Sequence, residues 1–557
     1  MKRIGATLAC LLLLALPLRA GWRKQPARAP SARFGARILL IPLDDRPPCL
    51  QFPVMMGLIG NAEVVTPPRA LLGRFLEPGQ PQQIEAWLRG QELHRFDAAI
   101  ISVDMLAYGG LVNSRIHRTP LSVALKRLDV ARWLRRRAPH LPIYGSSVIM
   151  RLAPTADGRN EAYRERLARW AEISPAAAQT ATQREEVAQL EREIPQEALA
   201  DYKRARARNL AVNRAALALV RQRVFDYLIL SQDDAKPRGV HIRDRERLVE
   251  EVTRLGLADR VAIQPGADEV SMLLLARALN HRFGYSPRVA ALYSSEKARQ
   301  SVAPYEDRPL HCTVSYHIAA TGSREVSDAD AADVLFYVYG SRAEPGAARS
   351  FAERIAADVR RGRRVIVADI DFKGDVQGAD PVFTDALRAR HVFPHLAGYA
   401  SWNTAGNTIG TALPQGLICA RALQTIAHRT DQLTQRIIGA QMKFLLHRLL
   451  DDYAYHTLVR PDTNRFARER QLDPNGLSGK GQALIEQFIR EQMRPHVDLL
   501  WRDFAGAPYV IGPRGEKLLW GSVTGIDNFY IRLPWGRTFE AELDFDLHTS
   551  SGPETDR

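Results

Sequence analysis

The chain has 557 residues, of which 46% are hydrophobic, so it can bury the cores of roughly two to four structural units. Its 77 Lys and Arg residues outnumber 62 Asp and Glu residues, which gives a formal net charge of +15. The cations are mostly arginines spread along predicted helices, and the sequence has no nucleic-acid-binding motif. We therefore expect no nucleic-acid partner. Two explanations of the charge stay open: an arginine-rich proteome, or attraction to an anionic envelope polymer.

The N-terminus has the pattern of an export signal. A cationic start, Lys2-Arg3, precedes the apolar run Ile4–Leu16, and Ala20 is a small residue at which signal peptidase can cleave. The run is shorter than the roughly 20 apolar residues that a membrane-spanning helix needs. We expect residues 1–20 to be a cleaved signal peptide, residues 21–36 a linker, and the mature protein to be periplasmic or secreted with no stable membrane anchor. An uncleaved N-terminal anchor is the alternative.

A repeated pattern follows, in which short runs of Val, Ile and Leu end in polar residues and helical stretches come next. Continuous apolar strands that alternate with helices indicate a parallel sheet covered on both faces. The runs are Arg37–Leu43, Ala62–Thr66, Ala98–Val103, Leu141–Ile149, Tyr227–Leu230, Val261–Gln264, Arg288–Tyr293, Asp333–Tyr339, Arg364–Ile370 and Leu396–Ala400. The predicted fold is α/β with a mostly parallel sheet. It is either a (β/α)-barrel with extra strands or a barrel followed by a small doubly wound unit.

Breaks in this pattern predict the domain boundaries. A charged helical insertion replaces the strand pattern at 155–223, and polar and apolar residues alternate near the C-terminus. The predicted segments are an α/β domain of catalytic type at 37–300, a second α/β part at 301–425, a helical region at 426–504, a β-rich region at 505–549 and a disordered tail at 550–557.

Acidic pairs follow several of the predicted strands. In a parallel α/β fold, the loops after the carboxyl ends of the strands form the site. These loops contain Asp44-Asp45-Arg46, Asp233-Asp234 and Asp268-Glu269. Adjacent carboxylates cannot both ionise freely, so one pKa rises, as a general acid near neutral pH requires. We predict Asp233 and Asp234 as catalytic residues. The structural alternative is that one Asp of a pair caps the next helix, with Lys236 or Arg238 neutralising the other after the fifth strand.

Other strand ends supply groups that suit a neutral polyol. Tyr and Trp faces stack on C–H surfaces, and Asn amides pair with hydroxyl groups. The predicted substrate-binding residues are Asp44, Asp45, Arg46, Asp104, Tyr108, Asp268, Glu269, Asp371, Tyr399, Trp402, Asn403 and Asn407. A structural turn with one buried tryptophan is the alternative for the segment 398–410.

Several familiar chemistries lack support in the sequence. No Walker loop, GxSxG elbow, HExxH motif or paired CxxC occurs, so we predict no cofactor. Signal removal leaves Cys49, Cys312 and Cys419, which allow at most one disulfide. A divalent metal is the alternative. Its oxygen ligands would be Asp44, Asp45, Asp233, Asp234, Asp268 and Asp371.

Three segments carry a family resemblance. They are Ile41-Pro42-Leu43-Asp44-Asp45-Arg46-Pro47, Ser231-Gln232-Asp233-Asp234 and Trp402-Asn403-Thr404-Ala405-Gly406-Asn407-Thr408. They resemble the motifs of a bacterial family catalogued as domain of unknown function 4127, over most of Ala36–Leu423. The acidic pair and the Trp/Asn segment also resemble, more weakly, retaining β-N-acetylhexosaminidases of the O-GlcNAcase type. That resemblance implies that Asp233 orients the acetamido group of the substrate and Asp234 is the general acid/base.

The leading hypothesis is an exported glycoside hydrolase-like enzyme that acts on an envelope or environmental glycan. An oxocarbenium-like transition state needs one carboxyl to protonate the leaving oxygen and a second group to stabilise the anomeric carbon, and the strand-end pair offers both. Two alternatives remain. One is a divalent-metal-dependent hydrolase with an all-oxygen acidic site, and the other is a non-catalytic glycan-binding envelope protein.

Overall fold

The computed structural model describes residues 34–157, 160–175, 179–372, 378–424, 431–514, 517–551 and 555–556. The predicted signal peptide, residues 1–20, lies outside the described residues, as does most of the predicted linker. Within the described part, no helix is long and apolar enough to cross a membrane.

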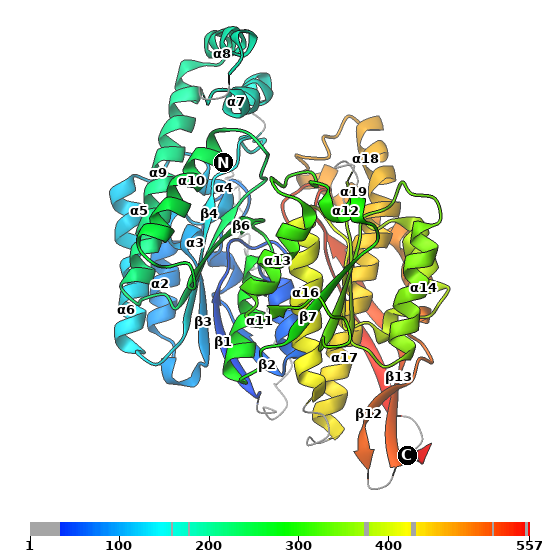
Figure 1. The fold of residues 1–557 in the computed structure, drawn as a ribbon. Helices are drawn as coiled ribbons and strands as arrows, with labels where there is room; N and C mark the ends of the chain where they lie inside the picture. Colours follow the sequence, from blue (N-terminus) through cyan, green and yellow to red (C-terminus); the bar gives the residue numbers. More distant parts are fainter. Residues whose placement is uncertain are drawn as a thin grey trace, which may run out of the picture. The chain divides into compact units, whose positions relative to one another are not determined.

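The first sheet is parallel and open (Figure 1). Within the described residues its strands are ordered β2-β1-β3-β4-β5-β6. They are β1 (Ala36–Ile41), β2 (Ala62–Val65), β3 (Ala98–Ser102), β4 (Ile143–Ile149), β5 (Tyr227–Gln232) and β6 (Val261–Pro265). The order reverses between β1 and β3, which is the topological switch point where doubly wound folds bind ligands. In β1, Ile38 and Leu40 are buried on one face and Leu39 and Ile41 on the other, which explains the continuous apolar run.

The second sheet is also parallel and open, with its described strands in the order β11-β10-β9-β7-β8. They are β7 (Arg288–Tyr293), β8 (Arg324–Glu325), β9 (Val334–Tyr339), β10 (Val365–Asp369) and β11 (Gly398–Ala400). The α/β class with mostly parallel strands is therefore confirmed, but the strands form two doubly wound sheets in place of a closed barrel. Strand β7 precedes the predicted boundary at residue 300 but belongs to the second sheet, because it pairs with β9.

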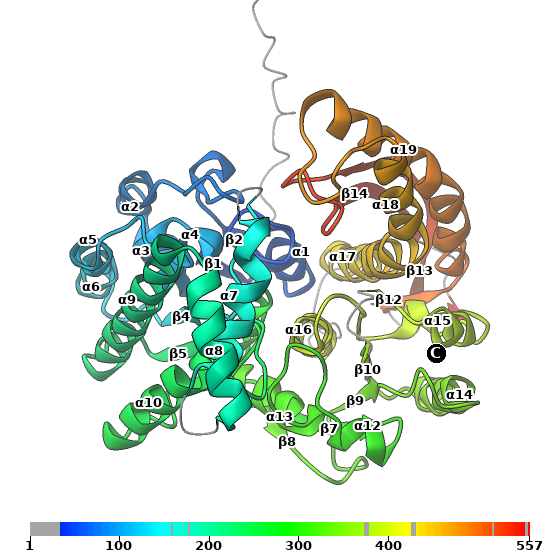
Figure 2. The ribbon, with the colours of Figure 1, turned by 90° about the horizontal axis from the view of Figure 1, so that it is seen from above.

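A shared layer of helices separates the two sheets (Figure 2). It contains α1 (Gln51–Ile59), α11 (Val270–Arg282), α13 (Leu310–Ala320) and α16 (Ala405–Gln424). Apolar side chains from one face of each sheet pack on this layer in one core cluster. Helix α11 is buried along most of its length. Because it carries the chain from β6 into the second sheet, the first sheet does not close on itself.

The outer face of the first sheet is covered by several helices that share a second core cluster. They are α2 (Pro81–Arg89), α3 (Val103–Tyr108), α5 (Leu121–Arg127), α6 (Asp129–Arg137), α9 (Gln196–Arg221) and α10 (Val240–Arg254), with the short α4 (Leu111–Ser114) after α3. The predicted helical insertion is confirmed. It consists of α7 (Glu161–Ile173), α8 (Ala181–Glu193) and α9, and the first half of α9 packs with the other two around a small core.

The outer face of the second sheet is covered by the helices after β9 and β10 and by the C-terminal part of the chain. The elements are α14 (Ala347–Arg360), α15 (Pro381–Arg388), α17 (Asp431–Arg448), the π-helix Leu449–Val459, α18 (Arg460–Glu469) and α19 (Gly479–Leu500), while α12 (Glu296–Gln300) follows β7. The predicted C-terminal β region is confirmed as an antiparallel sheet. Its strands are β12 (Tyr509–Arg514), β13 (Lys517–Arg532), β14 (Glu542–Ser551) and β15 (Thr555–Asp556).

The predicted disordered tail, 550–557, differs from the structure in its described part. Ser550 and Ser551 continue β14, and Thr555 and Asp556 pair with β13. Backbone pairing with the long strand β13 orders residues whose side chains give no strand signal. Residues 552–554 and 557 lie outside the described residues.

Candidate functional site

A polar cavity of about 220 Å³ lies at the carboxyl ends of the parallel strands. Its lining comes from the segments after β1, β3, β4, β5 and β6, from α7, from the segment after α12, and from the segments before α16 and β14. The polar and aromatic lining residues include Arg46, Arg115, Arg151, Arg164, Asp233, Asp234, Asp268, Tyr305, Asn403, Trp535, Arg537 and Phe539. The predicted loops of Arg46, Asp233-Asp234 and Asp268 thus meet in one place, together with Asn403. A larger cavity of about 470 Å³ is lined by residues such as Tyr144, Tyr227 and Arg277. Asp226 is the one carboxylate among the described residues that line this larger cavity, so the cavity offers no acidic pair.

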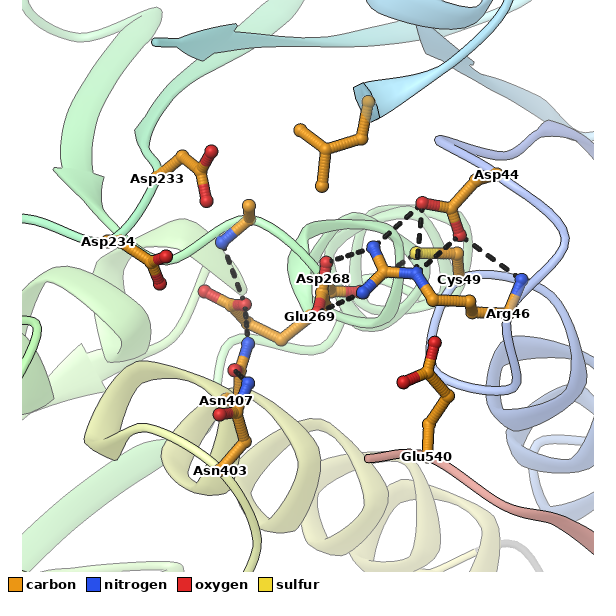
Figure 3. Close-up of polar contacts among 12 residues, drawn as sticks. Asp44, Arg46, Cys49, Asp233, Asp234, Asp268, Glu269, Asn403, Asn407 and Glu540 are labelled. Carbon is orange, nitrogen blue, oxygen red and sulfur yellow. Dashed lines mark hydrogen bonds and ion pairs between the residues drawn. The ribbon is translucent and has the colours of Figure 1, made fainter. Parts of the chain in front are cut away.

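Asp233 and Asp234 follow β5 directly and face the cavity (Figure 3). The Asp233 carboxylate is buried and lies 2.5 Å from Arg115, while the more exposed Asp234 lies 2.5 Å from Arg151. Within the described residues, both contacts use Oδ2, and neither Oδ1 atom makes a hydrogen bond. Each carboxylate therefore keeps one oxygen for a ligand. Burial raises the pKa of Asp233, although Arg115 acts in the opposite direction.

The structure does not contain the arrangement of the alternative prediction, in which one Asp of this pair caps the next helix and Lys236 or Arg238 neutralises the other. Helix α10 begins at Val240, and its N-cap residue is Gly239, so neither aspartate caps it. Lys236, which sequence reasoning proposed as a neutralising cation, pairs instead with Glu172 of the insertion.

Arg46 joins the loops after β1 and β6. Its guanidinium donates to the Asp44 carboxylate at 2.7 Å and to the Asp268 carboxylate at 2.6 Å, and all three side chains are buried. Burial raises the pKa of Asp268 to about 6, with Arg46 acting against it. The N-cap residue of α11 is Glu269 and no side chain caps this helix, so Asp268 does not have the alternative, capping role and is instead part of the ion pair.

Asp45 connects the first sheet to the C-terminal segment. Trp535 Nε1 donates to its Oδ1 at 2.7 Å, and Arg69 Nε donates to its Oδ2 at 3.1 Å. Trp535, Arg537 and Phe539 then form an aromatic and cationic wall of the cavity. Sequence reasoning missed this wall. The available signal was a tryptophan between Pro534 and Gly536, outside the alternating strand pattern.

Glu269 is fully buried behind the cavity. Its Oε2 accepts hydrogen bonds from the Ala267 backbone N–H at 3.0 Å and from Asn407 Nδ2 at 2.6 Å. Asn407 Oδ1 in turn accepts from Asn403 Nδ2 at 2.6 Å, and Asn403 lines the cavity (Figure 3). The two asparagines and the glutamate thus form one hydrogen-bonded chain that leads to the cavity wall.

Two further buried groups surround Glu269, and sequence reasoning missed both. His317 Nε2 lies 3.5 Å from Glu269 Oε1. Glu306 accepts hydrogen bonds from Gly406 N and the Thr313 hydroxyl, and burial raises its pKa to about 7. Neither residue follows a strand of the first sheet, so the strand-end rule did not find them.

Strained backbone gathers at the cavity. Asp234, Tyr305 and Asn403 have φ angles of 37°, 63° and 52°, in the left-handed region that side-chain-bearing residues rarely adopt. All three line the cavity. Such strain costs of order 1–3 kcal/mol per residue and concentrates at ligand sites.

Tyr399 and Trp402, predicted to stack on a polyol, lie away from the cavity surface. Tyr399 is fully buried in the core of the second sheet. Trp402 is 8% exposed, donates from Nε1 to the Thr411 hydroxyl, and packs edge-on against Phe52. Tyr305, Trp535 and Phe539 supply the aromatic surface in their place.

Asp371 lies at the end of the second sheet, where its carboxylate is 3.8 Å from Arg342, and it is not among the residues that line the cavity. Asp104 and Tyr108 belong to α3, under the end of the first sheet, and both are buried. Asp104 Oδ2 accepts from the Val148 backbone N–H at 2.8 Å. These residues support the strand ends and do not line the cavity.

The stability of Asp104→Asn relative to that of the native protein is expected to increase as pH rises. Burial raises the pKa of Asp104 from 3.8 to about 7, so the folded protein binds this proton more tightly than the unfolded chain. The contribution of this group to stability therefore falls as pH rises between these values, and Asn lacks this loss. The difference in unfolding free energy should grow by up to about 1.4 kcal/mol per pH unit in this window. Urea unfolding at several pH values measures it. A pH-independent difference would contradict the prediction, and Asp129→Asn at an exposed site is the control.

The described residues contain no group of three or more His, Cys, Asp or Glu side chains arranged to hold a metal ion. Arg46 pairs with both Asp44 and Asp268, while Asp233 and Asp234 pair with Arg115 and Arg151. The described cysteines, Cys49, Cys312 and Cys419, are free thiols.

The comparisons with known proteins agree with the first resemblance. A family model described as protein of unknown function (DUF4127) matches residues 38–544, from β1 into the last long strand. No curated protein matches the chain. Since the match covers nearly all of the folded body, including each cavity-lining segment, the chain belongs to the DUF4127 family of proteins of unknown function.

Proposed function

We propose that the protein is a glycoside hydrolase-like enzyme whose cavity binds a sugar unit of an envelope or environmental glycan. The observation that carries this proposal is the pair Asp233 and Asp234. Each retains a carboxylate oxygen toward a cavity that also offers aromatic faces and an amide. Glycoside hydrolases cleave the glycosidic bond with a pair of carboxyl groups. One protonates the leaving oxygen, and the other acts as a nucleophile or stabilises the positive charge at the anomeric carbon.

The two aspartates differ in a way that assigns roles. Burial raises the pKa of Asp233, the direction that keeps a proton for donation to a leaving oxygen. Asp234 is more exposed and is paired with Arg151, and we assign it the role of stabilising the anomeric carbon. The O-GlcNAcase resemblance implied the opposite assignment. The difference in burial leads us to propose Asp233 as the acid.

The lining also favours a substrate with acidic groups that extends beyond one sugar unit. Among the described arginines on the cavity, Arg164 makes no side-chain ion pair or hydrogen bond, so its charge remains for an anionic group. A second cavity of about 380 Å³ shares Arg115 and Thr155 with the first and is lined by α7 and α9 of the insertion. Two neighbouring cavities that share a wall support a glycan chain as the substrate, since it can occupy more than one subsite.

The test is turnover of a panel of aryl glycosides and acidic oligosaccharides, including N-acetylhexosaminides and uronides, with the purified native protein. Release of the aryl group or of shorter oligosaccharides supports the proposal. The predicted export is checked by N-terminal sequencing of protein from its native envelope, where detection of Met1 in the mature protein would contradict it.

A second candidate is a non-catalytic glycan-binding protein. It is favoured by the ion pairs that Asp233, Asp234 and Asp268 make with arginines, since such pairs also serve purely to shape a binding site. Saturable binding of a panel member without turnover would support this candidate and reject the hydrolase.

A further inference from the structure

The chain Glu269–Asn407–Asn403 fixes which end of the Asn403 amide faces the cavity. An asparagine side chain has one face that accepts hydrogen bonds and one that donates them, and the surrounding network decides its orientation. Here the network begins at a fully buried carboxylate and ends at a cavity-lining residue.

The first link is set by Glu269. Its Oε2 accepts from the Ala267 backbone N–H, a group that can only donate. The same oxygen lies 2.6 Å from the Asn407 amide. Asn407 must therefore turn its N–H₂ group toward Glu269 and its Oδ1 away from it.

The second link follows from the first. Asn407 Oδ1 accepts from the Thr404 hydroxyl at 3.1 Å and from the Asn403 amide at 2.6 Å. The Thr404 oxygen accepts from the Asn407 backbone N–H at 3.2 Å, and its hydroxyl donates to Asn407 Oδ1 because an amide oxygen can only accept. Asn403 Nδ2 therefore donates a hydrogen bond to Asn407, and within the described residues Asn403 Oδ1 makes no hydrogen bond.

Glu269 has little freedom to move. A Cβ atom added at Gly266 would lie 1.6 Å from Glu269 Oε1, and one added at Gly410 would lie 2.1 Å from its Cγ. On the far side, His317 Nδ1 donates to the Thr313 carbonyl at 2.7 Å, which leaves Nε2 facing Glu269 Oε1 at 3.5 Å. The close packing at Gly266 and Gly410 thus restricts the carboxylate that orients both asparagines.

We infer that Asn403 presents its carbonyl oxygen to the cavity and selects a ligand that places an O–H or N–H donor there, with Glu269 and Asn407 as positioning residues. That the ligand is a sugar rests on the proposed function. The orientation of the Asn403 amide does not depend on the proposed function. A site built to accept a hydrogen bond rejects analogues that lack the donor, because its acceptor is then left unpaired.

Neutron diffraction from deuterium-exchanged crystals of the native protein tests the orientation without any ligand. We expect deuterium on the Asn403 atom that faces Asn407 and none on the atom that faces the cavity. Deuterium on the cavity-facing atom would overturn the inference, whether or not the protein cleaves or binds a glycan.

A binding experiment tests the selectivity. Methyl glycosides bound by the native protein are compared with their mono-deoxy and mono-deoxyfluoro analogues by calorimetry, since fluorine cannot donate a hydrogen bond. At one hydroxyl position both analogues should bind at least about 10-fold more weakly, and Asn403→Leu should abolish this difference.

Asn528→Leu is the matched control, because Asn528 is also left-handed, with φ 50°, but is exposed and paired with Asp546 away from the cavity. It should leave the difference unchanged. A deoxyfluoro analogue that binds as well as the parent, at the position that depends on Asn403, would reject the acceptor role. If no glycoside binds, the proposed function fails while the neutron result still decides the orientation.

Discussion

Asp233→Asn is expected to lower the turnover of a methyl or oligosaccharide substrate by at least ~100-fold while leaving 2,4-dinitrophenyl glycosides much less affected. Loss of a general acid costs about 10²–10⁴-fold when the leaving oxygen needs a proton, and little when it leaves readily as an anion. Asp234→Asn should slow both substrate classes, because it removes stabilisation of the anomeric carbon. The comparison of kcat for the two leaving groups distinguishes the roles. Equal losses for both substrates in Asp233→Asn would contradict its assignment as the acid.

The same pair predicts the direction of the pH dependence. Burial raises the pKa of Asp233, and the acid works only in its protonated form. Turnover of substrates with poor leaving groups should therefore fall as pH rises through this raised pKa, and the basic limb should be absent from the Asp233→Asn profile.

Stability must be separated from chemistry in these variants. Arg115 is buried against Asp233, so Asp233→Asn leaves a buried cation with a weaker partner. Asp244→Asn is the matched control, because Asp244 is paired at 2.9 Å with the buried Arg206 and does not line the cavity. It should lose stability with turnover per folded molecule unchanged. If Asp233→Asn and Asp234→Asn also kept near-native turnover in the folded fraction, the hydrolase proposal would lose its main support.

The strands and their polar ends were predictable from sequence because each rests on a local signal. A strand buried on both faces needs a continuous apolar run, as Ile38–Ile41 illustrates, and parallel strands bring their carboxyl ends to one edge. The loops of Asp44, Asp233 and Asp268 were found in this way. The sequence left open whether the strands form one barrel or two units, because the apolar runs of β6 and β7 do not reveal that α11 places them in different, open sheets.

The partners of the acidic residues were not predictable because they come from distant segments. Arg115 and Arg151 follow other strands, and Trp535 reaches Asp45 across 490 residues of sequence. Nor does sequence distinguish a buried aromatic from one that faces a ligand. Tyr399 and Trp402 lie in a polar segment at a strand end, yet Tyr399 is buried in the core of the second sheet and Trp402 in the core shared by the two sheets.

Arg46→Met is expected to lower the free energy of unfolding by about 3–5 kcal/mol, the range for breaking a buried ion pair from one side. Arg46 is 6% exposed and satisfies two buried carboxylates from different loops, Asp44 and Asp268. Its guanidinium also stacks on Trp535, with 4.6 Å between the guanidinium carbon and the ring centroid. Met fills a similar volume but leaves both carboxylates buried without a cation. The control is Arg89→Met, which breaks the exposed ion pair with Glu85 and should lower the free energy of unfolding by less than about 1 kcal/mol.

The physical reason for this loss can itself be tested in the same background. If the cost arises from unpaired buried charge, adding Asp44→Asn and Asp268→Asn to Arg46→Met should restore much of the stability, since a neutral triad no longer needs a cation. If it arises from lost packing on Trp535, the added substitutions should restore nothing. Urea unfolding followed by tryptophan fluorescence measures the free energy of unfolding of Arg46→Met, of its combination with Asp44→Asn and Asp268→Asn, and of the control Arg89→Met. A loss below about 1 kcal/mol for Arg46→Met would mean that Arg46 does not hold the β1 and β6 loops together, and that the cavity keeps its shape by other contacts.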